Sequence, residues 1–145
     1  EAFPMKLSHT TIMETGGMKG RRKELTRVEI HEQLKKAFGN KDIHSEYGMT
    51  ELLSQAYAVK DGKFKCPSWM KVMIRDEEDP LSVRSSQPIV GCPLTGAINI
   101  IDLANVHSCS FIATDDVGRL YSDSSFEVLG RMDGSDLRGC SLLTV

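Results

Sequence analysis

The polar and apolar positions of the first sixty residues predict a strand, a helix and a second strand. Residues 7–14 are a β-compatible run that ends at the glycine pair 16–17. Residues 43–47 form the second β-compatible run, after which the chain bends at Gly48 into the polar pair 50–51. A helix that connects two short strands favours parallel neighbours in an α/β sheet.

The helix between these strands has defined ends. Thr26 and Glu29 have the spacing of a capping box, in which each side chain accepts a hydrogen bond from a backbone N–H group at the helix start, and this predicts a beginning near Arg27. Gly39 and Asn40 end the helix. The apolar positions between these ends follow the spacing of one buried helical face: Ile30, Leu34, Ala37 and Phe38.

The second half of the chain has a different pattern, in which short apolar segments follow one another closely. Turn-forming clusters such as 61–62 and 122–125 separate them, and this favours a small antiparallel sheet or barrel. We place the boundary between the two patterns near residue 60, so that residues 1–60 form an α/β segment and residues 61–145 a β-rich segment. The strands predicted in the second segment are residues 69–75, 87–90, 96–103, 110–114 and 126–129.

The composition narrows the function classes. The 145 residues include 18 basic and 20 acidic side chains, a net charge of −2, which argues against a general binder of nucleic acid or membrane surfaces. No run of 18 apolar residues occurs, so the sequence predicts no transmembrane helix. The four cysteines are scattered without a CxxC pair, which argues against a zinc ribbon and favours reduced thiols in the cytoplasm. The start at Glu1 suggests a fragment or a processed product.

Four short segments carry residues suited to nucleotide chemistry. Residues 47–51, Tyr-Gly-Met-Thr-Glu, place an aromatic ring, a hydroxyl and a carboxylate directly after a strand. An aromatic ring can stack on a base, a threonine can contact a phosphate oxygen, and a single carboxylate commonly holds Mg²⁺ beside substrate phosphates. The other three segments are the glycine pair 16–17, Thr-Asp-Asp-Val-Gly at 114–118 and Gly-Arg-Met-Asp at 130–133.

The order and spacing of these segments resemble those of the adenylate-forming superfamily of acyl and aryl ligases, whose adenylation domain has a glycine-rich adenine loop followed by YGxTE, TGD and GRxD motifs. Residues 14–20, 44–55 and 138–142 more closely resemble the LuxE-type acyl-protein synthetases, the fatty-acid-activating components of the bacterial luminescence reductase complex. The resemblance extends from about Lys6 to the C-terminus. It implies a mixed α/β (α+β) fold that forms the C-terminal part of an adenylation domain.

The resemblance also implies roles for individual residues. Thr50 and Glu51 are expected to be catalytic, with Glu51 as the metal ligand, so the implied cofactors are ATP and Mg²⁺. These synthetases are thought to pass the acyl group from acyl-AMP to a cysteine near their C-terminus, and Cys140 is the matching residue. The cofactor-binding residues that the resemblance implies are Gly16 and Gly17 in the adenine loop, Tyr47 stacked on adenine, Gly48 next to it, Thr50 on a phosphate, and Asp116 and Arg131 against the ribose.

Three departures from the family pattern shape these expectations. The phosphate loop with its lysine and the C-terminal lid domain are both absent, so the chain is expected to be part of a longer protein and inactive alone. Aspartate replaces the middle glycine of TGD, which leaves Asp115 as the alternative to Asp116. For Cys140 the alternative is a small buried residue, and the same structural role is expected of Cys66, Cys92 and Cys109.

The sequence therefore predicts an enzyme that activates a fatty or other carboxylic acid with ATP and transfers the acyl group to its own cysteine. The implied partners are the acid and an acyl reductase or acyl carrier, with no nucleic acid, and the oligomeric state stays open. Two alternatives are a phenylacetate–CoA-ligase-like acyl-CoA synthetase and a noncatalytic nucleotide-binding or assembly module.

Overall fold

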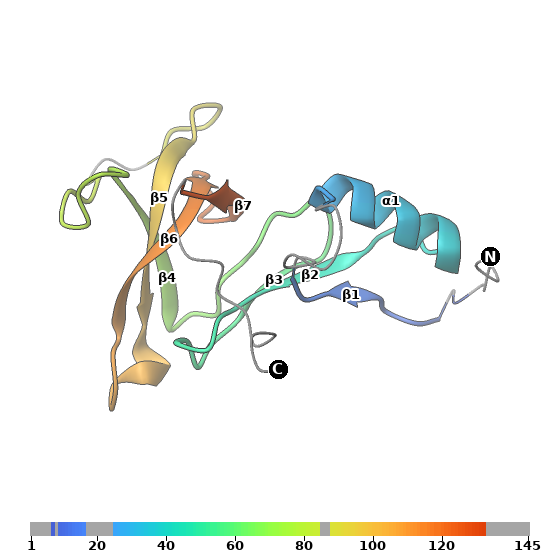
Figure 1. The fold of residues 1–145 in the computed structure, drawn as a ribbon, viewed down its shortest axis with the longest axis horizontal. Coiled ribbons are helices and arrows are strands. Elements are labelled where there is room, and N and C mark those ends of the chain that lie inside the picture. The colour runs from blue at the N-terminus through green and yellow to red at the C-terminus, as the bar shows by residue number, and fades with distance from the viewer. Residues whose placement is uncertain (1–6, 8, 17–24, 85–87, 133–145) are drawn as a thin grey trace, which may run out of the picture.

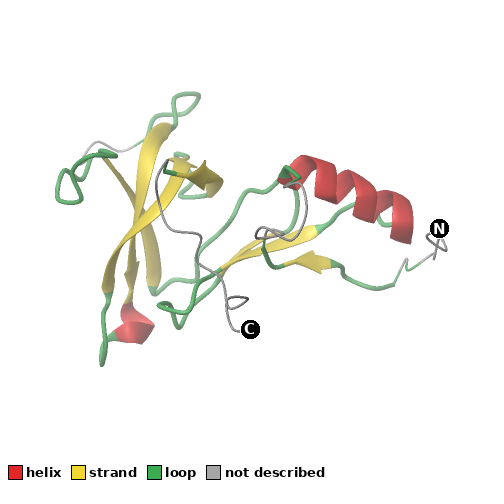
Figure 2. Cartoon of the chain, viewed as in Figure 1, coloured by secondary structure: helices red, strands yellow, loops and turns green. Residues whose placement is uncertain are grey.

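The computed structural model describes residues 7, 9–16, 25–84 and 88–132, which form two β-sheets and an α-helix (Figures 1 and 2). Figure 1 shows the helix against the smaller sheet, which the N-terminal part of the chain forms, and the larger sheet beside it. The predicted fold class, a strand–helix–strand unit followed by a β-rich remainder, is confirmed.

The smaller sheet has three strands in the order β1, β2, β3, which are Met13–Glu14, His44–Tyr47 and Ala56–Ala58. β1 and β2 are parallel, as predicted for strands that a helix connects. β2 and β3 are antiparallel, with Tyr47 opposite Ala56, so the loop between them contains residues 48–55. Because β1 and β2 run in the same direction, the loops that follow them leave the same edge of the sheet.

The helix α1 (Arg27–Phe38) begins and ends where the sequence predicts. Its capping box is formed, because the Glu29 N–H donates to Thr26 Oγ1 at 3.3 Å and the Thr26 N–H donates to the Glu29 carboxylate at 2.7 Å. Gly39 follows with a φ of 70°, and its N–H donates to the Lys35 carbonyl oxygen at 2.9 Å. Among the described residues, no helix has both the length and the apolar character needed to cross a membrane.

Polar contacts fix α1 to the sheet. His31 is buried, and its Nε2 lies 3.1 Å from Ser45 Oγ on β2. Burial lowers the pKa of His31 and outweighs the opposite effect of Glu14, whose carboxylate lies 3.8 Å away. At the start of the helix, the Arg27 guanidinium lies 4.9 Å from the centre of the Phe64 ring. The helix therefore contacts both β2 and the segment that leads into the larger sheet.

The larger sheet is antiparallel throughout, and its strand order follows the chain. A short 3₁₀ helix, η1 (Leu103–Asn105), follows the second of its strands. Phe64 pairs with Phe126 in an isolated antiparallel bridge, so the segment before the first strand lies against the last one. The four strands are β4 (Met70–Arg75), β5 (Leu94–Asp102), β6 (Phe111–Leu120) and β7 (Phe126–Arg131).

The structure corrects the predicted strands in several places, and of the run 7–14 only Met13–Glu14 forms a strand among the described residues. Residues 88–90 form no strand in the described part of the chain, where Ile89 makes only an isolated bridge to Cys92. β6 continues to Leu120 instead of ending at residue 114, because it pairs with β5 on one side and β7 on the other. Asp115 and Asp116 therefore lie within a strand rather than after one. The three-residue strand β3 is too short for its pattern to be recognised from sequence.

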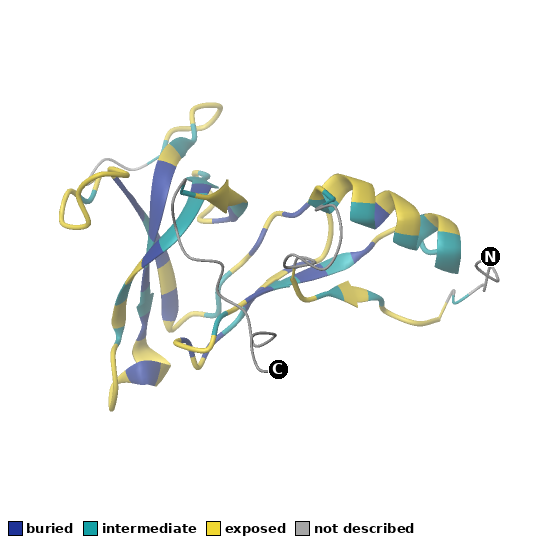
Figure 3. Ribbon diagram, viewed as in Figure 1, coloured by how far each residue is buried: buried dark blue, intermediate teal, exposed yellow. Residues whose placement is uncertain are grey.

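An aromatic cluster of Tyr47, Phe64 and Phe126 joins the two sheets. The rings of Tyr47 and Phe126 have centroids 5.4 Å apart at an interplanar angle of 82°, an edge-to-face contact, and those of Phe64 and Phe126 are also 5.4 Å apart. Figure 3 shows that buried positions concentrate along β2, β4 and β5. The apolar side chains that extend this core into the larger sheet include Val72, Ile74, Ile98 and Ile100.

Two glycines of the larger sheet provide a test of this packing. A Cβ atom at Gly118 would come within 2.7 Å of the Glu127 carbonyl oxygen and overlap the Ile98 side chain, whereas a Cβ atom at Gly130 would meet nothing within 4 Å. We expect Gly118→Ala to lower the free energy of unfolding by about 1 to 3 kcal/mol. The matched variant Gly130→Ala should change it by less than about 0.5 kcal/mol. Urea titration measures both values, and equal effects would contradict the described packing of β6.

Candidate functional site

The structure brings together two of the residues that the sequence singles out. The Tyr47 hydroxyl, at the end of β2, donates a hydrogen bond to Asp116 Oδ2 in β6, at 2.7 Å. The two residues are 69 positions apart in the chain and belong to different sheets. The loop after β2 therefore starts beside the middle of β6, at the junction of the two sheets.

The environment of Tyr47 fixes its protonation state. The side chain is 8% exposed and packs against Phe64 and Phe126. Burial raises the pKa of Tyr47 well above its ordinary value, and the Asp116 carboxylate adds to this effect. The hydroxyl therefore keeps its proton and acts as a donor to Asp116. Stacking of Tyr47 on adenine stays a prediction, and in this structure the ring belongs to the core.

The backbone N–H group of Asp116 also takes part in holding this residue in place. The Asp116 N–H donates to Thr114 Oγ1 at 3.1 Å, and the Thr114 hydroxyl in turn donates to the Ile98 carbonyl oxygen of β5 at 2.8 Å. Thr114 is buried and Asp116 is half-buried. These bonds position the Asp116 carboxylate on a rigid strand rather than on a loop.

Arg131 and Asp115 form a second pair close to Asp116. The Arg131 guanidinium lies 3.0 Å from Asp115 Oδ2, and the backbone register places Arg131 opposite Asp116. The sequence predicts Arg131 and Asp116 on the same ribose. The structure brings them to neighbouring strands and gives the two aspartates different partners, since Tyr47 contacts Asp116 and Arg131 contacts Asp115.

Thr50 and Glu51 lie in the loop between β2 and β3, and both are exposed. The Leu52 N–H donates to the Met49 carbonyl oxygen at 3.1 Å, which closes a turn around them. The Glu51 carbonyl oxygen accepts a hydrogen bond from Asn105 Nδ2 of η1, at 2.7 Å. The loop that carries the predicted phosphate and metal residues is thus attached to the larger sheet.

A buried aspartate that sequence reasoning missed makes the same attachment. Asp102, at the end of β5, is fully buried. Its carboxylate accepts hydrogen bonds from the N–H groups of Leu53 at 3.1 Å and Ser54 at 2.9 Å, from Ser54 Oγ at 2.7 Å, and from the Ala104 N–H at 3.1 Å. Trp69 Nε1 also donates to Ser54 Oγ, at 2.9 Å. In the sequence, only the place of Asp102 directly before a short helix, a position that favours aspartate, could have suggested a role for it.

The hydrogen bonds decide the charge of Asp102. Burial alone would raise the pKa of this carboxyl, but the bonds from Ser54, Ala104 and Leu53 together outweigh burial, so the pKa lies below its ordinary value. Asp102 is therefore ionised at neutral pH, and each of its bonds is charge-assisted.

The remaining predicted residues are only partly described. Gly16 is exposed, two residues after β1, with a φ of 148°, and a Cβ atom at this position would meet nothing within 4 Å. Gly48 directly follows β2, where a Cβ atom would lie 3.1 Å from the Gln55 side chain. Gly16 and Gly48 therefore lie at the same edge of the smaller sheet. Gly17 and Cys140 lie outside the described residues.

The described cysteines differ from one another. Burial raises the pKa of Cys66 to about 11, so this thiol is almost fully protonated at neutral pH and fits the predicted structural role. Cys92 and Cys109 are exposed, which corrects the expectation of small buried residues. In the part of the chain that the structure describes, no three His, Cys, Asp or Glu residues group in a way that could hold a metal ion.

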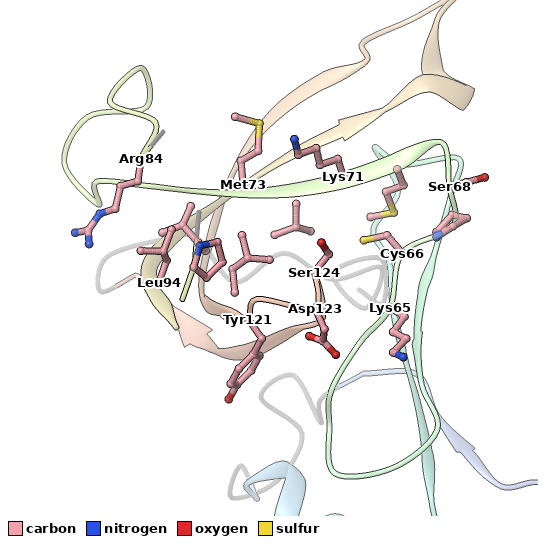
Figure 4. A pocket seen from close by; sticks show the side chains of 16 residues that line it. Lys65, Cys66, Ser68, Lys71, Met73, Arg84, Leu94, Tyr121, Asp123 and Ser124 are labelled. Atoms are coloured by element: carbon pink, nitrogen blue, oxygen red, sulfur yellow. The ribbon is translucent and has the colours of Figure 1, made fainter. Parts of the chain in front are cut away.

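A pocket of about 520 Å³ lies away from the predicted residues, between β4 and the turn that joins β6 to β7 (Figure 4). Its wall includes Cys66 and Leu94, and Lys65, Arg84 and Asp123 supply charges. A second pocket of about 510 Å³ lies beside α1. Neither pocket contains Tyr47, Thr50, Glu51 or Asp116.

Solved structures match the chain in fold, whereas no family model and no curated protein sequence matches it. Apo MatB from Rhodopseudomonas palustris aligns with a TM-score of 0.56 at 14% identity, over 85% of this chain and 26% of that chain. Coronafacic acid ligase from Pectobacterium brasiliense aligns with a TM-score of 0.54 at 18% identity, over 88% of this chain and 25% of that chain. The luciferase-like enzyme from the nonluminescent mealworm Zophobas morio aligns with a TM-score of 0.51 at 17% identity, over 83% of this chain and 31% of that chain.

These similarities define the fold. The chain has the architecture of one part of these proteins, and it spans about a quarter of the length of MatB and of coronafacic acid ligase. An ATP-bound structure of MatB aligns equally well, with a TM-score of 0.55.

The buried carboxylate of Asp102 leads to a prediction of how the free energy of unfolding depends on pH. Asp102→Asn should lower the free energy of unfolding by about 1 to 3 kcal/mol at pH 7, because two or more charge-assisted bonds are lost. Since the pKa of Asp102 is lowered on folding, its stabilisation is fully present above the ordinary value of about 4 and is lost as the pH falls through the lower, folded value.

Urea unfolding of the wild type and of Asp102→Asn between pH 7 and pH 2.5 measures this effect. The difference between the two proteins should be largest at neutral pH and should shrink below about pH 4. Asp42→Asn, at an exposed position, is the control and should follow the wild type. A difference that stays constant over the whole range would show that Asp102 is not ionised in the folded protein.

Proposed function

We propose that this chain is the nucleotide-binding part of an adenylate-forming ligase that activates a carboxylic acid. The observation that carries the proposal is the Tyr47–Asp116 hydrogen bond, which joins the Tyr-Gly-Met-Thr-Glu segment to the Thr-Asp-Asp segment. In the ligases that the sequence resembles, these two segments bind one nucleotide. The fold shared with ATP-bound MatB supports the same conclusion.

Asp116 is the proposed residue for the ribose. A carboxylate accepts hydrogen bonds from neighbouring hydroxyl groups, and Asp116 is only half-buried, so a ligand can reach it. The Tyr47 hydroxyl and the Thr114 side chain hold it in place before the nucleotide binds. Arg131, next to Asp115, is the proposed second contact. Gly16 and Gly48, at the shared edge of β1 and β2, allow the backbone to approach the adenine closely.

Thr50 and Glu51 are the proposed residues for the phosphates and the metal. Mg²⁺ is usually bound through one or two carboxylates together with substrate phosphates, which fits a loop that presents one exposed carboxylate. When bound, this ion neutralises charge on the phosphates. In the proposed first step, an oxygen of the acid attacks the α-phosphorus of ATP, a new P–O bond forms, and pyrophosphate leaves with the electron pair of the broken bond. Thr50 donates a hydrogen bond to a phosphate oxygen and Glu51 holds the ion.

A cysteine of the same protein is the proposed acyl acceptor. Its thiolate attacks the carbonyl carbon of the acyl adenylate, a thioester C–S bond forms, and AMP leaves with the electron pair of the C–O bond. The thiol proton passes to solvent beforehand. Cys140 is the candidate from the family resemblance, and among the described cysteines Cys66 is unsuitable because burial raises its pKa to about 11.

Glu51→Gln tests the first step. ATP–pyrophosphate exchange by the whole protein, in the presence of Mg²⁺ and fatty acids of different chain lengths, should slow by at least about tenfold, because the metal loses its carboxylate ligand. The circular dichroism spectrum should not change, since Glu51 is exposed. Glu78→Gln removes an exposed carboxylate from the turn after β4 and is the matched control. An exchange rate unaffected by Glu51→Gln would refute the role of this residue.

Intact-mass spectrometry tests the second step. After incubation with Mg²⁺, ATP and a fatty acid, the wild-type protein should gain the mass of the acyl group, and hydroxylamine should remove it because a thioester is cleaved. Cys140→Ser should show no adduct, while Cys66→Ser should retain it. Formation of AMP that accelerates with CoA and leaves no adduct would instead support an acyl-CoA synthetase. Nucleotide binding without any turnover would support a noncatalytic module.

A further inference from the structure

The loop that carries Thr50 and Glu51 is fastened to the end of β5 at three points. The Glu51 carbonyl oxygen accepts from Asn105 Nδ2, and the N–H groups of Leu53 and Ser54 donate to Asp102 Oδ2. The two anchoring side chains are buried, with exposures of 0% for Asp102 and 3% for Asn105. The two side chains that they hold from behind, Thr50 and Glu51, are exposed.

Chain connectivity alone does not determine the position of this loop. Residues 48–55 join two strands of the smaller sheet, whereas Asp102 ends β5 of the larger sheet and Asn105 lies in η1, directly after that strand. A buried ionised carboxylate is costly unless it is fully hydrogen-bonded, and Asp102 accepts four bonds, three of which come from Leu53 and Ser54. The fourth, from Ala104, is a local bond that any capping aspartate would make.

We propose that Asp102 and Asn105 are positioning residues, which hold Thr50 and Glu51 in the geometry that binds nucleotide phosphates and Mg²⁺. This inference rests on the proposed function of the loop. Asp102 fixes the backbone on the C-terminal side of Glu51, and Asn105 fixes the Glu51 peptide itself. Tyr47, bonded to Asp116, fixes the N-terminal side. The loop is therefore held at both ends on the sheet that carries the proposed ribose residue.

Ser54 connects this anchor to a third element. Its hydroxyl donates to Asp102 Oδ1 and accepts from Trp69 Nε1, which precedes β4. A hydroxyl that donates one bond and accepts another has the direction of its O–H group set by both partners. The loop position is thus determined by β5, η1 and the start of β4 together.

The experiment compares Asp102→Asn and Asn105→Ala with Asp123→Asn in the whole protein. Asp123 is a matched control because it also accepts hydrogen bonds from a serine, Ser125, through both N–H and Oγ, but in the turn between β6 and β7. Two quantities are measured. Hydrogen–deuterium exchange of peptides covering residues 49–56 reports the anchor directly, and ATP–pyrophosphate exchange as a function of Mg²⁺ concentration reports its consequence.

We expect both anchor variants to speed amide exchange at residues 49–56 and to raise the Mg²⁺ concentration for half-maximal rate by about tenfold or more, because residues behind a metal ligand typically contribute roughly 10- to 100-fold to affinity or activity. In a Glu51→Gln background, Asp102→Asn should shift the Mg²⁺ dependence no further, since its effect passes through Glu51. Asp123→Asn should change neither measurement.

Three results would overturn the inference. One is unchanged amide exchange at residues 49–56 in Asp102→Asn. Another is a rate loss without any shift in the Mg²⁺ dependence, which indicates general destabilisation. The third is a shift of the Mg²⁺ dependence by Asp102→Asn that is as large in the Glu51→Gln background as in the wild-type background. A wild-type protein without pyrophosphate exchange refutes the proposed function instead, and the catalytic part of this inference falls with it, whereas the amide-exchange comparison still decides whether Asp102 holds the loop.

Discussion

A buried carboxylate at the end of β5 is the interaction on which the arrangement of the two sheets depends most. Asp102 is fully buried and charged, and a buried carboxylate is stable only when hydrogen-bond donors surround it. Three of its four bonds come from residues 53–54, which belong to the other sheet's loop. If the loop moved away, an unpaired charge would remain in the interior. This penalty gives the loop one position, where apolar packing alone would tolerate several.

The aromatic cluster makes the second connection between the sheets, and it creates the environment of the candidate site. Phe64 and Phe126 exclude water from one side of Tyr47, so its hydroxyl keeps its proton and needs a partner. Asp116 is that partner. The side chains that the site uses therefore depend on the same burial that stabilises the fold, and a change at Phe126 would affect both the core and the orientation of Asp116.

Local signals in the sequence predicted the helix α1 and the strand β2 well, and long-range contacts explain much of what they missed. Thr26, Glu29 and Gly39 define α1 by bonds within a few residues, so its ends can be derived from the sequence. The extension of β6 through Asp115 and Asp116 depends on two partner strands, and aspartate itself disfavours strands. The role of Asp102 depends on donors 48 and 49 positions away. No periodicity or spacing rule reaches that far.

A bulge in β7 determines which residue of β6 lies opposite Arg131. Gly118 pairs with Val128, but Val117 pairs with Gly130, so one residue of β7 has no partner and the register beyond it shifts by one. Arg131 thereby lies opposite Asp116, where a regular ladder would have placed it opposite Asp115. The bulge therefore brings the backbone of Arg131 beside Asp116, the residue that accepts the hydrogen bond from Tyr47. The Arg131 guanidinium lies 3.0 Å from Asp115 Oδ2, so the register sets Arg131 beside Asp116 while its side chain pairs with the neighbouring aspartate.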